Sequence, residues 1–140
     1  MGIRALMSID VERIEEVATT VVHEAVTLHR ELGPGLLESV YEVTLADALS
    51  RRGLGVQRQT AVGLKFRDRS FPEAFRADLI VEESMILEIK SIDQIVAAHR
   101  KQLLTYLRLS RLPIGFLLNF GAAWMKDGIV RMVNGLPEKG

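Results

Sequence analysis

Residues 75–90 read FRADLIVEESMILEIK, and the aliphatic and β-branched runs on either side of an acidic turn predict a β-hairpin. Side chains alternate between the two faces of a strand, so Glu88 and Lys90 are expected on the same face. Asp78 can reach that face from the neighbouring strand. The hairpin therefore predicts two carboxylates and an ammonium group at the edge of an otherwise apolar sheet.

These three side chains suit a divalent metal ion and a hydrolytic water. Mg²⁺ and Mn²⁺ prefer oxygen ligands in octahedral geometry and keep several waters. Asp78 and Glu88 can supply two carboxylate oxygens, and the backbone carbonyl of Ile89 can supply a third. Lys90 can orient or deprotonate the attacking water, or neutralise the transition state. With Mg²⁺ or Mn²⁺ as cofactor, the set suffices for phosphodiester hydrolysis. A surface ion-pair ladder, which contributes little to stability, is the simpler alternative.

Apolar periodicity and Gly/Pro breakers extend the prediction to the rest of the chain. The expected elements are helices at 10–32, 37–52 and 95–109, and strands at 55–66, 71–82, 85–91, 114–120 and 128–133. Ser8 or Asp10 could cap the first helix, and Asp93 the third. The order ααβββαββ predicts an α/β fold with a central mixed β-sheet flanked by helices. The strands on either side of the third helix should be parallel.

Length and composition limit the class of protein. The 140 residues fit a single domain, 1–140, with loose ends at 1–8 and 134–140. A content of 48% hydrophobic and 26% charged residues is typical of soluble globular proteins. The absence of cysteine excludes a disulfide framework, a thiol nucleophile and a cysteine zinc site. No apolar run approaches the ~20 residues of a membrane span, and we expect a cytoplasmic protein with no membrane partner.

The net charge of zero counts mildly against a nucleic-acid-binding protein, although the charges are unevenly distributed. Basic residues concentrate between 51 and 76 and again between 99 and 111. These two basic clusters bear on function only if they flank Asp78.

Two helices carry further candidates for the site. Gln102 and Tyr106 are four residues apart and should share a helix face, either at the site or towards solvent and core. Glu38 and Tyr41 are three residues apart on the second helix. Glu38 could join the site, or it could simply stabilise the positive end of its helix.

Residues 35–41, GLLESVY, resemble the signature of the GxxExxY proteins, a prokaryotic group in the PD-(D/E)xK nuclease superfamily. The resemblance runs from about Ile14 to Val133. It includes RAD at 76–78, LEIKS at 87–91, QLLTYL at 102–107 and LLNFG at 117–121. Each piece alone is weak, but their order and spacing together are specific.

The resemblance implies a restriction-endonuclease-like core and a set of site residues. These are Asp78, Glu88, Lys90, Glu38, Gln102 and Tyr106. Asp78 and Glu88 would bind metal, Lys90 would assist the water, and an acidic residue on an early helix, here Glu38, would join the metal ligands. Gln102 and Tyr106 match the Gln-x-x-x-Tyr of exonuclease-like members. One departure from the superfamily pattern is Ala77, where a proline is usual.

The sequence therefore predicts a metal-dependent nuclease whose partner is nucleic acid, with DNA favoured over RNA. Two alternatives stay open. One is a catalytically silent nuclease-fold module that binds nucleic acid or protein. The other is a homo-oligomeric structural protein that uses the apolar first helix as an interface. A homodimer is also compatible with a nuclease that cuts two strands.

Overall fold

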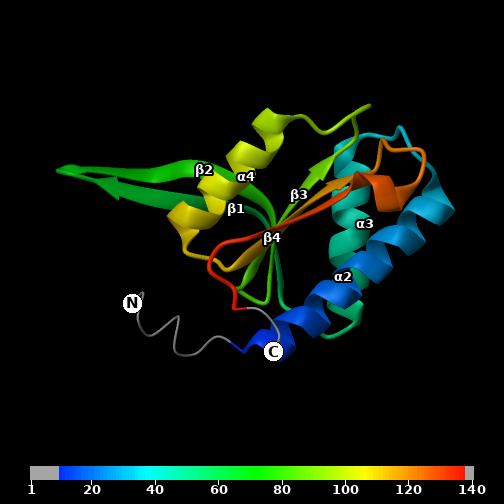
Figure 1. Cartoon of the computed structure of the whole chain (residues 1–140), viewed down its shortest axis with the longest axis horizontal. Coiled ribbons are helices and arrows are strands. Elements are labelled where there is room, and N and C mark those ends of the chain that lie inside the picture. The colour runs from blue at the N-terminus through cyan, green and yellow to red at the C-terminus, as the bar shows by residue number, and fades with distance from the viewer. Residues whose placement is uncertain (1–9, 138–140) are drawn as a thin grey trace.

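A five-stranded mixed sheet forms the centre of the computed structural model, which describes residues 10–137 (Figure 1). The strands are β1 (Val56–Phe66), β2 (Arg69–Val81), β3 (Met85–Lys90), β4 (Ile114–Asn119) and β5 (Ile129–Val133), and they lie side by side in that order. The β3–β4 pair is parallel, and the other three pairs are antiparallel. The predicted parallel crossover is confirmed.

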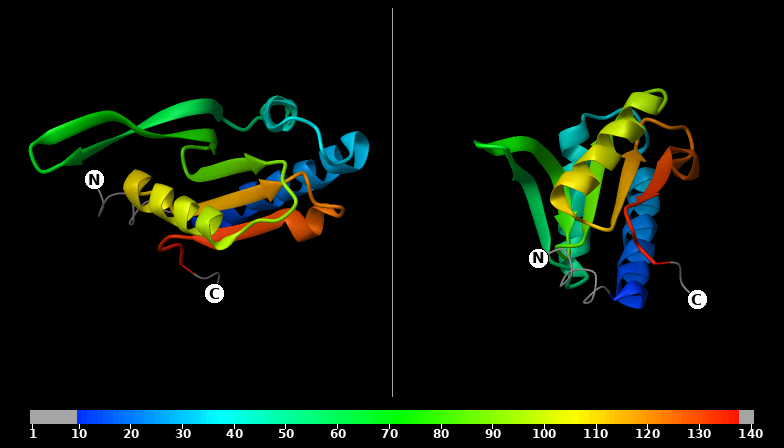
Figure 2. Two further views of the ribbon diagram at one scale, coloured as in Figure 1. Left: turned by 90° about the horizontal axis from the view of Figure 1, so that it is seen from above. Right: turned by 60° about the vertical axis from the view of Figure 1, so that its left-hand side comes forward.

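Helices cover both faces of this sheet (Figure 2). They are α2 (Val11–Leu32), α3 (Glu38–Arg51) and α4 (Ala97–Ser110), and a short 3-10 helix, η1 (Met125–Gly128), precedes β5. Helices α2 and α3 pack with one face of the central strands, and α4 packs with the other. The α/β class and the expected order of helices and strands are confirmed, with η1 as an addition.

Alternation along β3 decides which side chains face which helix. Leu87 and Ile89 enter the core formed with α2 and α3, whereas Ile86 enters the core formed with α4. Because side chains alternate, Glu88 and Lys90 follow Ile86 on the α4 face. The whole of β4 is buried, as its unbroken apolar run predicted. The fold thus places both polar residues of β3 beside α4.

The helix starts differ in how they are capped. Asp10 caps α2, because its Oδ1 accepts a hydrogen bond from the backbone N–H of Arg13 at 3.0 Å. The predicted Asp93 cap on α4 is wrong, since the helix begins after Val96. There the backbone N–H of Val96 donates to Nδ1 of His99 at 3.0 Å. The N3 side chain thus satisfies the N–H of the N-cap residue, which is a different bond from the one that an N-cap aspartate makes to the first turn.

The apolar stripe of the first helix is part of the core. Val17, Val21 and Ala25 are at most 1% exposed and pack with α3 and the sheet. The stripe is therefore not available as the oligomer interface that the sequence suggested. Within residues 10–137, no helix is long and apolar enough to cross a membrane.

The two ends that were expected to be loose are only partly described. Residues 1–8 and 138–140 lie outside the described residues. Asn134 is held by hydrogen bonds, because its backbone N–H donates to the carbonyl of Pro113 at 2.8 Å. Its side-chain amide also donates to the carbonyls of Leu107 and Leu112, each at 3.1 Å. This residue ties the end of β5 to the end of α4.

Candidate functional site

Asp78 and Glu88 interlock where β2 separates from β3. The β2–β3 ladder ends at the pair Leu79 and Leu87, one residue from each carboxylate. The backbone N–H of Asp78 donates to Oε2 of Glu88 at 2.9 Å. The N–H of Ile89 donates in turn to Oδ2 of Asp78 at 2.8 Å. Each carboxylate thus replaces a backbone acceptor of the opposite strand, and the pair comes together as the sequence predicted.

Burial makes the charge on Glu88 costly. The residue is 6% exposed, and burial together with the nearby charge of Asp78 raises the pKa of its carboxyl to about 8. The Asp78 N–H bond and the Lys90 ammonium lower that pKa, but they do not outweigh the burial. A buried acid beside a second carboxylate and a raised pKa are typical of functional sites.

Lys90 lies one alternation beyond Glu88 on the same face. Its positive charge favours the ionised form of Glu88, which indicates that its ammonium is close to the pair. Among residues 10–137 the ammonium makes no hydrogen bond and no ion pair. The backbone N–H of Ile89 points towards Asp78, and in an extended strand the carbonyl of the same residue faces the same side.

The helix α3 presents two acids to this region, and they behave differently. Glu38 is exposed, and its Oε2 accepts from the backbone N–H of Ser91 at 3.1 Å, so it holds the chain just after Lys90. Glu42, one turn later, is 6% exposed, and its charge also raises the pKa of Glu88. Glu42 is therefore the α3 acid whose charge acts on the carboxylate pair.

Sequence reasoning missed Glu42 and its partner Gln59. The Nε2 amide of Gln59 donates to Oε1 of Glu42 at 2.6 Å and, more weakly, to Oδ1 of Asp78 at 3.3 Å. Arg58 completes the cluster through a 3.0 Å ion pair with Oε2 of Glu42. One signal was readable, since Glu42 falls on the same helical stripe as the buried Leu45 and Leu49. An acid at a core position needs a partner.

Helix α4 brings Tyr106 close to the pair, whereas Gln102 makes no hydrogen bond with either acid in the described structure. The Tyr106 ring stacks on Phe75 with centroids 3.9 Å apart. Burial and the charges of Glu88 and Asp78 raise the pKa of its hydroxyl, so the ring lies close to both acids. Gln102 is exposed and forms no hydrogen bond with any residue between 10 and 137.

The donor set fits a small divalent cation that keeps much of its water. In the described part of the chain, no group of three or more histidine, aspartate or glutamate side chains is arranged to hold a metal ion. Asp78 and Glu88 nevertheless offer adjacent carboxylates. Glu88 is buried, and the nearby charge of Lys90 does not compensate for its burial, so a bound cation would stabilise its ionised form. Mg²⁺ and similar ions are commonly bound by one or two carboxylates, with waters and substrate oxygens completing the shell.

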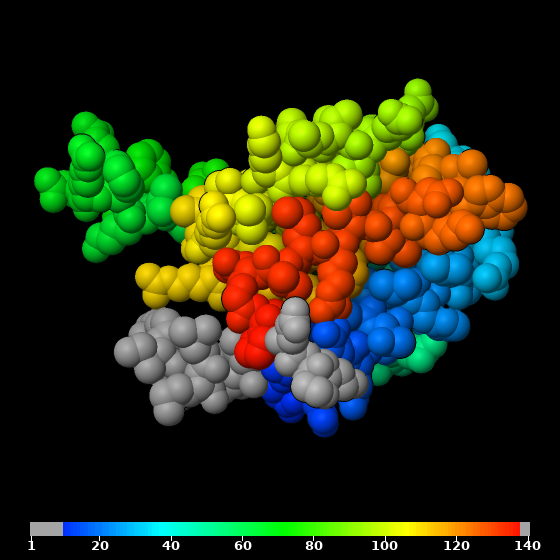
Figure 3. Space-filling view, viewed as in Figure 1, coloured from blue at the N-terminus to red at the C-terminus, as the bar shows by residue number. Residues whose placement is uncertain are grey.

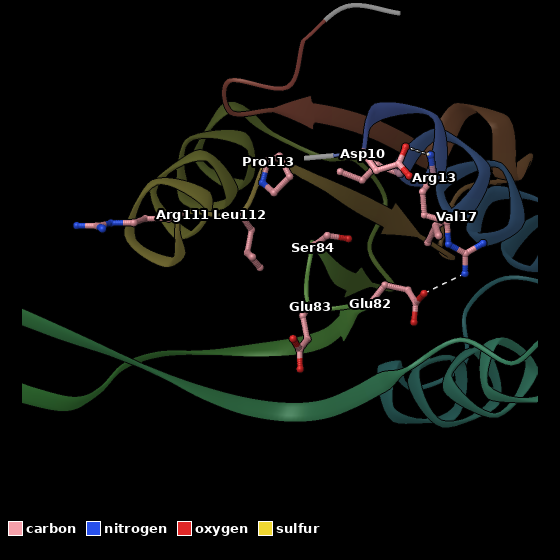
Figure 4. A pocket seen from close by; sticks show the side chains of 10 residues that line it. Asp10, Arg13, Val17, Glu82, Glu83, Ser84, Arg111, Leu112 and Pro113 are labelled. Carbon is pink, nitrogen blue, oxygen red and sulfur yellow. Dashed lines mark hydrogen bonds and ion pairs between the residues drawn. The ribbon is translucent and has the colours of Figure 1, made fainter. Parts of the chain in front are cut away.

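A separate hollow of about 370 Å³ lies at the other end of β3 and contains none of these residues (Figure 4). Two of its charged groups pair with each other, since Arg13 donates to Oε1 of Glu82 at 3.0 Å. The Gly55 N–H donates to Oε2 of Glu82, and these bonds lower the pKa of that carboxyl. The hollow is thus a structural junction between α2, β1 and the β2–β3 turn.

Comparison with known proteins identifies one family. Residues 15–132 match the family model described as the PD-(D/E)XK nuclease superfamily. No curated protein and no solved structure matches the chain.

Proposed function

Because the chain belongs to the PD-(D/E)XK nuclease superfamily, we propose that it is a metal-dependent nuclease that hydrolyses phosphodiester bonds of nucleic acid. The interlocked pair of Asp78 and Glu88, with the unpaired Lys90 beside it, is the observation that carries the proposal. The proposal includes the narrower GxxExxY membership and a cytoplasmic location.

Asp78, Glu88 and the carbonyl of Ile89 would hold Mg²⁺ or Mn²⁺ at this site. The ion would polarise the phosphate and lower the pKa of a bound water. Glu88 has to give up its proton to act as a ligand, since its pKa of about 8 keeps the carboxyl largely protonated at neutral pH. Glu42 is the candidate for a third acid near the ion, and Glu38 positions the chain after Lys90.

Lys90 would serve the attacking water, because its ammonium has no competing partner in the described structure. It can orient the water or stabilise the charge that builds up on the phosphate oxygens. In the reaction, the water oxygen would form a bond to phosphorus while the water gives its proton to solvent. The ester P–O bond would break, and the departing alkoxide would take up a proton from solvent. Tyr106 and Gln102 would support the substrate from α4.

Cleavage by purified variants tests this assignment. The wild type should nick or degrade DNA or RNA when Mn²⁺ or Mg²⁺ is added, and Asp78→Ala and Lys90→Ala should abolish that activity. A matched control is Asp47→Ala, because Asp47 lies on the exposed side of α3 in a surface ion pair with Arg51. Equal cleavage by the wild type and both site variants would indicate a contaminating nuclease and contradict the proposal.

A catalytically silent binding module is the second candidate, and Gln59 favours it. Its amide already bonds Glu42 and Asp78, which would leave the acids satisfied without a metal ion. This alternative predicts nucleic-acid or protein binding that survives Asp78→Ala, with no cleavage under any metal. Wild-type cleavage that is lost in Asp78→Ala would exclude it.

A further inference from the structure

The β1–β2 hairpin continues well beyond the sheet as a two-stranded arm. Strand β2 pairs with β3 only from Leu79 to Val81. The β1–β2 ladder, in contrast, runs on to the pair Phe66 and Arg69. We call residues 60–77 the arm. It projects from the body, and its tip stands clear of every helix (Figures 1 and 3).

The outer part of the arm has no core of its own. Residues 69–74 are all exposed, and Phe66 and Phe71 near the tip are 56% and 45% exposed. An isolated two-stranded hairpin in water is marginally stable at best. Exposed aromatic rings on such an element are therefore better explained by contact with a partner than by folding.

The tip carries unpaired positive charge. Lys65, Arg67 and Arg69 surround the turn, and none of them forms an ion pair within residues 10–137. The Arg67 guanidinium lies 5.0 Å from the centroid of its neighbouring Phe66 ring. Arg76 near the root of the arm behaves differently, because it pairs with Glu73 at 2.7 Å. The free cations are thus at the far end of the arm.

Helix α4, which contacts the root of the arm, also carries positive charge. From Ala97 to Arg111 the chain contains no acidic residue, and its arginines and lysine are exposed without ion pairs in the described structure. Those cations are Arg100, Lys101, Arg108 and Arg111. The stack of Phe75 on Tyr106 joins the arm to this helix next to Asp78 and Glu88. The candidate site therefore lies where the root of the arm meets α4.

We infer that the arm is a DNA-binding element that lies in the major groove of a duplex, while the basic face of α4 contacts the phosphate backbone. The binding of DNA by the arm does not depend on the proposed function. Only the further statement that the bound duplex is cleaved rests on it. The arm would hold the duplex, and Asp78 at its root would face the strand to be cut.

The dimensions and charge of the arm favour duplex DNA over other nucleic acids. The major groove of B-DNA, about 12 Å wide, admits a two-stranded β-ribbon, whereas that of A-form RNA is too deep and narrow for side chains to read. At about 3.3 Å per residue, residues 60–66 extend roughly 20 Å, which exceeds the groove depth of about 8.5 Å. Exposed phenyl rings can contact thymine methyl groups, and cations neutralise phosphates.

Binding without cleavage provides the test. A short fluorescent DNA duplex is titrated with the protein in EDTA over a series of salt concentrations, and single-stranded DNA and duplex RNA are measured alongside. The arm variant is Lys65→Ser/Arg67→Ser/Arg69→Ser. The control, Arg30→Ser/Arg51→Ser/Lys126→Ser, removes the same formal charge from exposed positions outside the arm and α4, of which Arg51 is in a surface ion pair with Asp47.

The arm variant should bind duplex DNA at least about tenfold more weakly than the wild type, and the control should not. The salt slope is the slope of the logarithm of the binding constant against the logarithm of the salt concentration. Each lost phosphate contact reduces its magnitude on B-DNA by about 0.9, so the slope of the arm variant should be smaller by about 2 to 3. Phe66→Ser/Phe71→Ser should also weaken duplex binding, but it should leave the salt slope unchanged because it removes no charge.

Several results would overturn the inference. These are equal losses in the arm and control variants, no wild-type binding to duplex DNA, or an arm effect confined to single-stranded DNA or RNA. A change in sedimentation of the arm variant with unchanged DNA affinity would instead make the arm an interface between copies of the chain. Arm-dependent binding with no cleavage in any metal would support the arm and contradict the nuclease proposal.

Discussion

At the scale of single residues, the main feature of the candidate site is the Glu88 carboxyl, whose charged form is disfavoured by burial. Glu88 is buried beside Asp78, and its pKa of about 8 lies far above the ordinary glutamate value of 4.5. Between these two values the folded protein holds a proton that the unfolded chain has released. The free energy of unfolding of the metal-free protein should therefore fall as pH rises from 4.5 to 8.

Glu88→Gln should remove this penalty, because the amide carries no charge and its oxygen can still accept from the Asp78 N–H. In urea unfolding at pH 8 without metal, the variant should be more stable than the wild type by a few kcal/mol, on the order of the shift itself. The difference should shrink as pH falls towards 4.5. If the difference in unfolding free energy between variant and wild type were the same at pH 4.5 and pH 8, the raised pKa of Glu88 would be contradicted.

Glu82→Gln is the matched control, and its effect should have the opposite sign. The bonds from Gly55 and Arg13 lower the pKa of Glu82, so its charge stabilises the folded state above the unfolded pKa. That stabilisation is lost as pH falls through the lowered value. At neutral pH this variant should be slightly less stable than the wild type, because the side chain is partly exposed and solvent screens it.

Calorimetry with Mn²⁺ tests the metal ligands directly. The wild type should bind Mn²⁺ with release of close to one proton at neutral pH, because Glu88 must ionise to coordinate. Asp78→Asn should lower the affinity on the order of tenfold or more. Asp47→Asn, at an exposed position on α3, should leave it unchanged. Indistinguishable isotherms for Asp78→Asn and the wild type would exclude Asp78 as a ligand.

The part of this site that could be predicted from sequence is the part set by residues close together in the chain. Strand alternation is local, so it was enough to bring Asp78, Glu88 and Lys90 to one edge. Glu42 and Gln59 meet only because α3 packs across β1, a contact between distant segments that no spacing rule contains. Glu38 was named from the family resemblance. The burial of Glu42 was readable from its helical stripe, but its contact with Gln59 was not.

At the scale of elements, the turn between α2 and α3 depends on one hydroxyl. The Tyr41 hydroxyl donates to the carbonyl of Gly33 at 2.6 Å and accepts from the N–H of Leu36 at 3.1 Å. Its ring is fully buried and stacks on Phe120 at 4.4 Å. In this structure the tyrosine of the GLLESVY segment therefore fixes the entry to α3 and, through it, the position of Glu38 and Glu42.

Tyr41→Phe should keep the stack and lose both bonds, leaving a backbone donor and acceptor unsatisfied at the turn. The expected loss in the free energy of unfolding is about 1–3 kcal/mol, measured by urea denaturation at a single pH. Thr20→Val removes an exposed hydroxyl bond within α2 and should cost less than about 0.5 kcal/mol. A Tyr41→Phe variant as stable as the Thr20→Val variant would show that the hydroxyl does not hold the turn.

Element boundaries were predictable where local chemistry sets them. The α2 cap at Asp10 and the end of α2 before Gly33 follow from residue type. The start of α4 did not, because His99 bonds backwards to the N–H of Val96 and replaces the expected Asp93 cap. A side-chain bond of this kind depends on a rotamer, which composition and periodicity do not report.

At the scale of the whole molecule, the restriction-endonuclease-like α/β fold is confirmed by the mixed sheet and by the family match over residues 15–132. The element order and the handed crossover limit the topology strongly, which is why the sheet was predictable. The length of the arm could not be predicted, because the sequence pattern of β1 and β2 does not show where their pairing continues without β3. Nor did the sequence show that the arm and α4 meet beside Asp78, because the stack of Phe75 on Tyr106 joins segments that are far apart in the chain.

The early separation of β2 from β3 also bears on how such a protein can diversify. Between Leu79 and the tip, β2 pairs with β1 but not with β3. Residue pairs can therefore be inserted or removed near Phe66 and Arg69 without shifting the register between β2 and β3 at Leu87. Under the proposed function, changes at the distal turn would alter which nucleic acid the arm contacts and would leave Asp78, Glu88 and Lys90 in place.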